Sequence, residues 1–265
     1  MAISEPITIK GVPPKRNLVP GAKTVLAIAS GKGGVGKSSV ATNLAIALQK
    51  SGATVGLFDA DIFGPSLPKM LATQGVGLTM TEDERINPIE TFGVKNISIG
   101  NVVPEDQAAL WRGPMVHQAL NQFLDGVNWG ELDYFLLDLP PGTGDVHLTM
   151  VQSLNVDGAV VVSTPQDVAI GDVRKCIDMF RKVNIPLAGI VENMAYFECD
   201  HGERYHLFGK DGAKQLAKKA ELAYLGEIPL LPAIMDGGET GQPYALTDQE
   251  EIFANIAKKI IKLYT

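Results

Sequence analysis

The sequence predicts an α/β fold: a doubly wound, mainly parallel sheet with helices on both faces. Three observations support this prediction. Short apolar runs alternate along the chain with segments of helical periodicity. A glycine-rich string, GKGGVGKS (31–38), stands between the first apolar run and the first helical segment. Further polar residues also follow directly on apolar runs, as expected where the carboxyl ends of parallel strands meet at a ligand site.

Composition supports a large core and one domain. The chain has 265 residues, of which 45% are hydrophobic, and a formal net charge of −7. We expect a single domain over residues 23–265, preceded by an arm over 1–22 that is rich in proline, glycine and basic residues. The acidic balance argues against nucleic-acid partners and anionic membranes. The chain shows neither an apolar secretory core nor a membrane-length apolar run, so a cytoplasmic location without membrane attachment is expected.

The individual elements follow from periodicity. TVLAIAS (24–30) is a continuous apolar run that ends at glycines, which is typical of a buried parallel strand. The next segment, 38–50, places Val40, Leu44 and Leu48 on one helical face. The same criteria predict strands at 53–59, 87–91, 96–100, 133–138, 159–164, 187–193 and 223–229, with helices at 115–124, 168–183, 212–220 and 249–263.

The glycine-rich string matches the phosphate-binding pattern G-x-x-x-x-G-K-[ST]. Its glycines let several backbone N–H groups face one anion, and the following helix adds its positive end. Lys37 should reach the β- and γ-phosphates, and the Ser38 hydroxyl should bind Mg²⁺. The predicted nucleotide-binding residues are Gly31, Lys32, Gly33, Gly34, Val35, Gly36, Lys37, Ser38, Ser39 and Asn193.

Acidic residues at two predicted strand ends could serve the metal and the attacking water. Asp59 and Asp61 follow the strand 53–59, and they lie beside the phosphate loop if the first two strands share that edge of the sheet. Asp59 is then a Mg²⁺ or switch residue and Asp61 positions water, although capping of a short following helix is an alternative. Asp138 ends the apolar strand 133–138, the pattern of an acid that holds Mg²⁺ through water.

Two further loops admit two interpretations each. DLPPGTGD (138–145) is either a switch loop, whose glycine N–H groups approach the γ-phosphate, or a plain turn. Asn193 ends the strand 187–193, where its amide either reads the adenine edge or terminates the strand. The absence of an N-K-x-D string favours ATP over GTP.

The loop GKGGVGKS resembles the deviant Walker A loop of the MinD, ParA and nitrogenase-iron-protein ATPases. Together with DADIFGPS (59–66), WRGPMVHQAL (111–120), DYFLLDLPPGTGD (133–145), STPQDVAIGDVRK (163–175) and GIVENMAYFEC (189–199), it resembles the Mrp/ApbC family of iron–sulfur cluster carrier ATPases. This resemblance implies a MinD-like fold and slow ATP hydrolysis with Lys32, Lys37 and Asp61 as catalytic residues. It also implies an ATP-promoted homodimer in which Lys32 reaches the partner's phosphates, and transfer of clusters to apoprotein clients. The small N-terminal domain of many members is expected to be absent.

The cysteines depart from the family pattern, which has a C-x-x-C pair after the strand 187–193. Only Cys199 matches this pair. Two Cys199 residues across a dimer supply two thiolates, and His201 could complete a Cys₂His₂ cluster site. Alternatively, Cys199, His201 and His206 hold Zn²⁺, or no metal binds. Cys176 is expected to pack inside a helix.

Two other functions compete with the carrier. A MinD/ParA-type positioning ATPase is suggested by the amphipathic C-terminal segment, in which Ile252, Phe253 and Ile256 share an apolar face near lysines. Such helices also pack commonly on a core. A regulatory ATPase that has lost cluster binding is suggested by the missing cysteine. His117 and His147 are expected to satisfy local hydrogen bonds rather than to bind metal.

Overall fold

The structure is a computed structural model that describes residues 19–62, 64–101, 123–144, 147, 150–151, 154–248 and 251–265. Nearly all of the predicted N-terminal arm lies outside these residues. So do most of the predicted helix 115–124, His117, and Asp145 at the end of the predicted switch loop.

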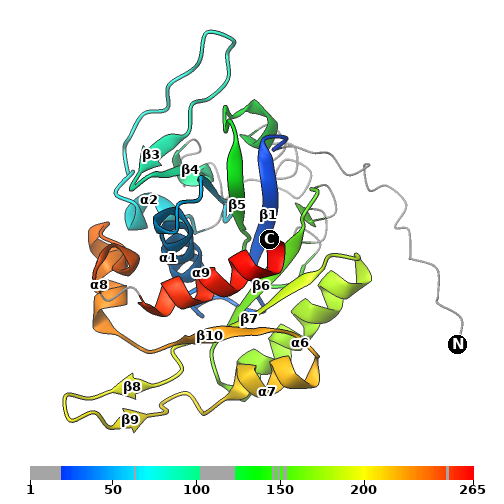
Figure 1. Cartoon of the computed structure of the whole chain (residues 1–265), viewed down its shortest axis with the longest axis vertical. Helices are drawn as coiled ribbons and strands as arrows, with labels where there is room; N and C mark the ends of the chain where they lie inside the picture. Colours follow the sequence, from blue (N-terminus) through cyan, green and yellow to red (C-terminus); the bar gives the residue numbers. More distant parts are fainter. Residues whose placement is uncertain are drawn as a thin grey trace, which may run out of the picture.

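One twisted sheet organises the chain (Figure 1), with the strand order β10-β7-β6-β1-β5-β2-β4-β3. Seven strands pair in parallel, and β3 alone is antiparallel to its neighbour β4. This arrangement confirms the predicted doubly wound, mainly parallel sheet. The strands are β1 (Ala22–Ser30), β2 (Val55–Asp59), β3 (Ile89–Thr91), β4 (Val94–Ser98), β5 (Leu132–Asp138), β6 (Gly158–Ser163), β7 (Leu187–Asn193) and β10 (Tyr224–Ile228).

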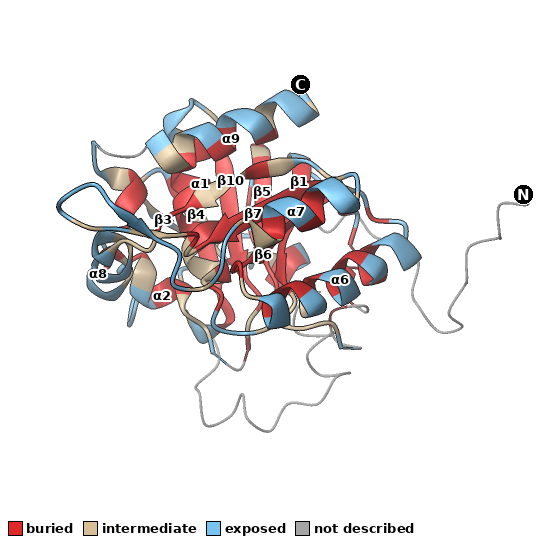
Figure 2. Cartoon of the chain, turned by 90° about the horizontal axis from the view of Figure 1, so that it is seen from below, coloured by how far each residue is buried: buried red, intermediate tan, exposed pale blue. Residues whose placement is uncertain are grey.

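Helices cover both faces of this sheet. The described α-helices are α1 (Lys37–Lys50), α2 (Leu67–Met70), α6 (Asp167–Lys182), α7 (Gly212–Lys219), α8 (Pro232–Thr240) and α9 (Glu251–Tyr264). The structure also describes two short 3₁₀ turns, η1 (Ile99–Asn101) and η2 (Tyr244–Leu246). In Figure 2, α1 and α9 lie above the sheet, and α6 lies below it.

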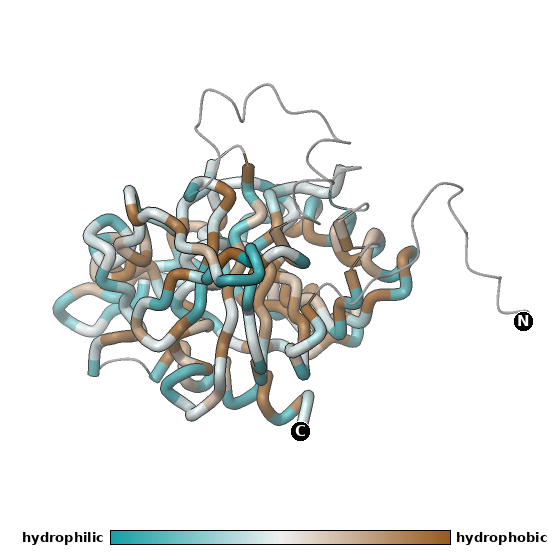
Figure 3. Tube along the Cα trace, turned by 90° about the horizontal axis from the view of Figure 1, so that it is seen from above, coloured by the Kyte–Doolittle hydropathy of each residue, from teal (hydrophilic) through white to brown (hydrophobic). Residues whose placement is uncertain are grey.

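Alternation along each strand divides the apolar residues between two cores. Leu26 and Ile28 of β1 point into the core under α1 and α9, whereas Ala27 and Ala29 point into the core under α6 and α7. This is the two-residue period of a strand buried on both faces, which explains why the strands read as continuous apolar runs. Figure 3 agrees, since brown segments recur in the middle of the molecule and the outer loops are mostly white or teal.

The C-terminal helix packs on the core. Phe253, Ile256 and Ile260 of α9 are almost fully buried against α1 and β10. Burial of an amphipathic face against the sheet removes the feature that suggested a surface-binding positioning ATPase. None of the helices in the described ranges is long and apolar enough to cross a membrane.

One point of the strand order determines how the acidic residues meet the glycine-rich loop. Strands β1 and β2 are not neighbours, because β5 lies between them and pairs with both. In this register Asp138 is level with Ile28 on one side and with Asp59 on the other. The order therefore places the Asp138 strand end, rather than the Asp59 end, directly beside the strand that leads into the glycine-rich loop.

Candidate functional site

The glycine-rich loop joins the end of β1 to the first turn of α1. Gly34 and Gly36 both have φ of +79°, the left-handed region that L side chains rarely adopt. A Cβ on Gly36 would also lie 2.2 Å from the Asn193 amide nitrogen. Glycine at position 36 is therefore required twice, by its backbone conformation and by the close approach of β7.

A cavity of about 220 Å³ opens over this loop. It brings together most of the residues predicted to bind phosphate, and it adds four that the sequence did not point to, Ser30, Ser66, Met70 and Pro141. Its lining comprises Ser30, Lys32, Gly33, Gly34, Val35, Gly36, Lys37, Ser38, Ser39, Asp61, Ser66, Met70 and Pro141. Backbone amides, two lysines and four serines around one hollow fit a polyphosphate.

Lys37 and Asp138 form a buried ion pair beneath the cavity. The Lys37 ammonium lies 2.5 Å from Asp138 Oδ1 and 3.2 Å from the Ser38 hydroxyl. The other carboxylate oxygen, Asp138 Oδ2, is buried and accepts no hydrogen bond from the part of the chain that the structure describes. Burial raises the pKa of Asp138, and Lys37 opposes this rise. An unsatisfied buried carboxylate oxygen next to a serine hydroxyl fits the second coordination shell of Mg²⁺, because hard oxygen groups suit this cation.

Asp59 organises the chain after β2. Its carboxylate accepts the backbone N–H groups of Asp61, Ser66 and Leu67 at 3.0–3.2 Å, and the Ser98 hydroxyl at 3.0 Å. Burial, followed by the neighbouring charge of Asp138, raises the pKa of Asp59 to about 7. Two of these amides begin α2, so the capping role that the sequence left open is present in the structure.

Asp61 and Lys32 both line the phosphate cavity and are only partly buried. The partial exposure of Asp61 leaves its carboxylate accessible to a water molecule. The Lys32 ammonium lies 3.4 Å from the amide oxygen of Gln166 in the loop before α6. Gln166 was not singled out from the sequence, although it lies in the motif STPQD.

Asn193 ties the end of β7 to the phosphate loop. Its side-chain nitrogen donates to the Val35 carbonyl at 2.8 Å. It also borders a second cavity of about 220 Å³, which is mostly apolar and is lined by Gly36, Ser39, Met70, Asn193, Met194, Pro229, Leu230, Leu231, Ile234, Met235, Gly238 and Glu239. The two cavities share Gly36, Ser39 and Met70, so a polar hollow and an apolar hollow meet at the start of α1.

Cys199 lies apart from both cavities, on a hairpin of β8 (Phe197–Glu198) and β9 (Arg204–Tyr205). The Cys199 carbonyl accepts the Gly202 amide at 2.8 Å, which closes a tight turn, and the thiol is free and partly exposed. His201 is exposed at the tip of this turn. In one chain, Cys199, His201 and His206 do not meet as a metal-binding group, and the His206 ring instead contacts the Ala195 carbonyl. The single-chain zinc site therefore finds no support.

Cys176 is buried inside α6, and burial raises the pKa of its thiol to about 12. A thiol with so high a pKa is a poor metal ligand, as expected for a cysteine that packs as a small apolar residue.

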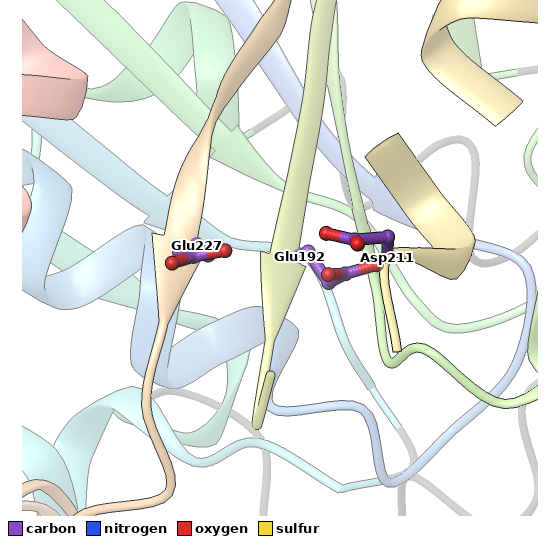
Figure 4. Close-up of side chains that lie close together, drawn as sticks. All are labelled: Glu192, Asp211 and Glu227. Atoms are coloured by element: carbon purple, nitrogen blue, oxygen red, sulfur yellow. The ribbon is translucent and has the colours of Figure 1, made fainter. Parts of the chain in front are cut away.

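Three carboxylates outside the predicted site approach one another (Figure 4). One carboxylate oxygen from each of Glu192, Asp211 and Glu227 lies within 4.8 Å of the other two. Glu192 is buried and accepts the Ala213 amide at 2.5 Å, so it ties the end of β7 to the first turn of α7. Burial raises the pKa of Glu192. The sequence did not reveal this group because its members come from three separate elements.

Comparison with known proteins finds relatives along almost the whole chain. A family model described as ParA, NUBPL iron-transfer P-loop NTPase, matches residues 21–264. The iron-sulfur cluster carrier protein of Aquifex aeolicus is 48% identical over 249 residues, which cover 92% of this chain and 68% of that protein.

Solved structures agree with the fold. A nucleotide-binding protein from Archaeoglobus fulgidus, in complex with ADP, is 37% identical and superposes with a TM-score of 0.78 over 88% of this chain and 92% of that chain. The cell division ATPase MinD of Pyrococcus furiosus is 23% identical, with a TM-score of 0.66 over 91% of this chain and 99% of that chain. At this lower identity, MinD supports the fold alone, which is the MinD-like arrangement predicted from the motifs.

Proposed function

Because the chain belongs to the NUBPL iron-transfer P-loop NTPase family, we propose that it hydrolyses ATP and carries iron–sulfur clusters to apoproteins. ATP hydrolysis is supported by the phosphate cavity, with Lys37 and Asp138 paired beneath it. Cluster transfer is supported by the relatives that are named as cluster carriers. The free Cys199 thiol is the group of this chain that could hold the cargo.

The nucleotide would span the two cavities that meet at the start of α1. Phosphates suit the polar cavity, where loop amides and the Lys37 ammonium would bind their oxygens. The adenine suits the apolar cavity beside Asn193 and Leu231. The Asn193 donor is engaged by Val35, so its amide oxygen would be the group that reads the base.

Mg²⁺ would neutralise charge on the β- and γ-phosphates when bound. The Ser38 hydroxyl would be its direct ligand, and the unsatisfied Asp138 Oδ2 would accept from its water shell. Asp61 would orient the attacking water. Asp59 would act as a switch residue, because its bonds to Asp61, Ser66 and Leu67 transmit any movement at the strand ends to the cavity mouth.

Lys32 would complete the site of a second subunit. Among the residues that the structure describes, its ammonium has one long contact, to Gln166, and Lys32 lines the phosphate cavity. A lysine supplied across a dimer would stabilise charge that develops on the transferred phosphoryl group, as an arginine finger does. We expect Lys32→Ala to retain ATP binding and to lose roughly 10²–10³-fold in turnover.

This lysine assignment has a direct test. Light scattering with a non-hydrolysable ATP analogue should show a dimer for the wild type and a weaker dimer for the Lys32→Ala variant, with turnover measured in parallel. Unchanged turnover and unchanged dimerisation in the variant would remove Lys32 from the mechanism.

The cluster would bridge two subunits. Two Cys199 thiolates and two His201 imidazoles give four ligands of the kinds that hold iron–sulfur clusters. Transfer is tested by loading the protein anaerobically with iron and sulfide and mixing it with apo-aconitase. Activation that requires Cys199 supports the carrier. Wild-type protein that hydrolyses ATP but activates nothing would instead favour the regulatory ATPase that has lost cluster binding.

A further inference from the structure

A buried histidine lies behind the loop that follows Asp138. His147 is 4% exposed, and its Nε2 meets the carbonyl oxygen of Pro140. A carbonyl only accepts hydrogen bonds, so Nε2 must carry the proton and donate it. Burial lowers the pKa of His147; the hydrogen bond to Pro140 opposes this shift, and the nearby charge of Lys37 adds to it. The ring is therefore a neutral donor, held between the core and the loop.

Among the residues that the structure describes, few hydrogen bonds hold the loop that follows Asp138 in place. Leu139 donates to Ile28 at 3.0 Å and Gly142 donates to Ser30 at 3.1 Å, so both ends are attached to β1. Between them lie Pro140 and Pro141, which have no N–H to donate. Pro140 is buried, and a buried carbonyl without a donor costs about 1–3 kcal/mol. The hydrogen bond from His147 therefore satisfies the Pro140 carbonyl in the middle of this loop.

The same peptide shapes the phosphate cavity. Pro141 lines that cavity, and its ring would lie 3.8 Å from a Cβ on Gly33 of the phosphate loop. Because His147 contacts the carbonyl of Pro140, the residue before Pro141, the histidine lies behind the phosphate side of the site. The apolar cavity lies on the Asn193 side and does not include this loop.

We propose that His147 is a positioning residue for ATP hydrolysis, which fixes the loop after Asp138 by donating to the Pro140 carbonyl. This role rests on the hydrolysis proposed above. The histidine touches neither phosphate nor metal and acts through Pro140 and Pro141. Loss of the His147 hydrogen bond should let the loop after Asp138 shift beside the phosphates. The adenine-binding cavity and the phosphate-loop amides should stay in place. The expected signature is a lower kcat with little change in nucleotide affinity.

Two substitutions of similar volume distinguish the effect of the His147 hydrogen-bond donor from the effect of the space that its ring fills. His147→Leu fills the space without a donor, whereas His147→Gln places an amide N–H near the position of Nε2. We expect kcat for ATP to fall about tenfold in the leucine variant, as the loss of one buried hydrogen bond predicts. The glutamine variant should recover most of this loss. Affinity for a fluorescent ATP analogue should change less than about threefold in both variants.

Thermal unfolding shows whether each variant is folded at the assay temperature. Equal kcat in wild type and the leucine variant would overturn the role, and so would an equal fall in both variants, because volume rather than the donor would then matter. If the leucine variant does not fold, the glutamine variant decides, since its kcat must stay near wild type. Wild-type protein without any ATP turnover would overturn the proposed hydrolysis itself, which distinguishes that failure from failure of the His147 role.

Discussion

Lys37 and Asp138 are 101 residues apart in sequence, and the sheet brings their charges to 2.5 Å. The lysine is 6% exposed and the aspartate 0%. Such a pair is costly to bury, but it holds the ammonium in place beneath the phosphate loop. When phosphate binds, the lysine can share its donors between two anionic groups, so little reorganisation is needed.

Substitution of Lys37 should separate binding from stability. Lys37→Ala removes the phosphate donor and should abolish ATP binding. It should also destabilise the fold by about 3–5 kcal/mol, because it leaves Asp138 buried without its partner. Adding Asp138→Asn removes the buried charge and should restore much of the stability but none of the binding. Urea unfolding and nucleotide titration measure the two effects. A double variant no more stable than Lys37→Ala would contradict the assigned pairing.

At the scale of elements, α9 illustrates how an amphipathic pattern can be read in two ways. Ile256 is 1% exposed and packs into the core under α1, whereas Leu263 on the same helix is 50% exposed. We expect Ile256→Ala to cost about 2–5 kcal/mol in unfolding free energy and Leu263→Ala less than about 0.5 kcal/mol. Chemical denaturation compares the two. Similar costs for both would mean that α9 does not dock on the sheet as described.

Asp133 joins three segments at the amino end of the sheet. Its carboxylate accepts the Lys23 ammonium at 2.8 Å, and the backbone N–H and hydroxyl of Thr54 at 2.8 and 2.9 Å. The bond from Lys23, followed by those from Thr54, lowers the pKa of Asp133 to about 2. A lowered pKa in the folded state means that the carboxylate stabilises the fold above about pH 4, and that this stabilisation is lost as pH falls toward about 2.

Asp133→Asn should therefore destabilise the protein at neutral pH but by less in acid. The gap in unfolding free energy between wild type and variant should shrink to about half near pH 3, where the unfolded carboxyl is mostly protonated and the folded one is not. Urea titrations at several pH values measure it, with Thr54→Val as a milder control. A gap that is constant from neutral pH to about pH 3 would show that the charge of Asp133 contributes nothing.

Some of the helices and strands could be predicted from the sequence and others could not. The strands and long helices were predictable, because runs such as TVLAIAS and the periodic residues of α6 carry local signals. Helix α8 was missed, since it contains Gly237 and Gly238 and its apolar residues are confined to its first turn. Strands β8 and β9 were missed because each has two residues and β9 is exposed.

For the site, the motifs predicted which residues are functional but not how these residues are arranged in space. The pattern at 31–38 and the acid at 138 were readable because each follows an apolar run. The position of β5 between β1 and β2 was not, since strand order depends on packing across the whole sheet. Consequently the buried Lys37–Asp138 pair, the donors around Asp59 and the link from His147 to Pro140 emerged only from the structure.

At the scale of the whole molecule, the cysteine hairpin and the phosphate loop leave the same edge of the sheet. The hairpin follows a short connection after Asn193, the residue that also donates to the Val35 carbonyl of the phosphate loop. A nucleotide-bound second subunit facing this edge would bring a second Cys199 and a second Lys32. The proposed ATPase and carrier functions thus both depend on one pairing of the chain with itself.

The most direct test of the carrier is the iron and acid-labile sulfide content of protein purified without oxygen. Wild-type protein should contain both elements, with the charge-transfer absorbance of a cluster, and Cys199→Ala should lose them. Cys176→Ala, which changes the buried thiol, should retain them and serves as the matched control. Iron and sulfide that are absent from the wild type after anaerobic reconstitution, or unaffected by Cys199→Ala, would contradict the account.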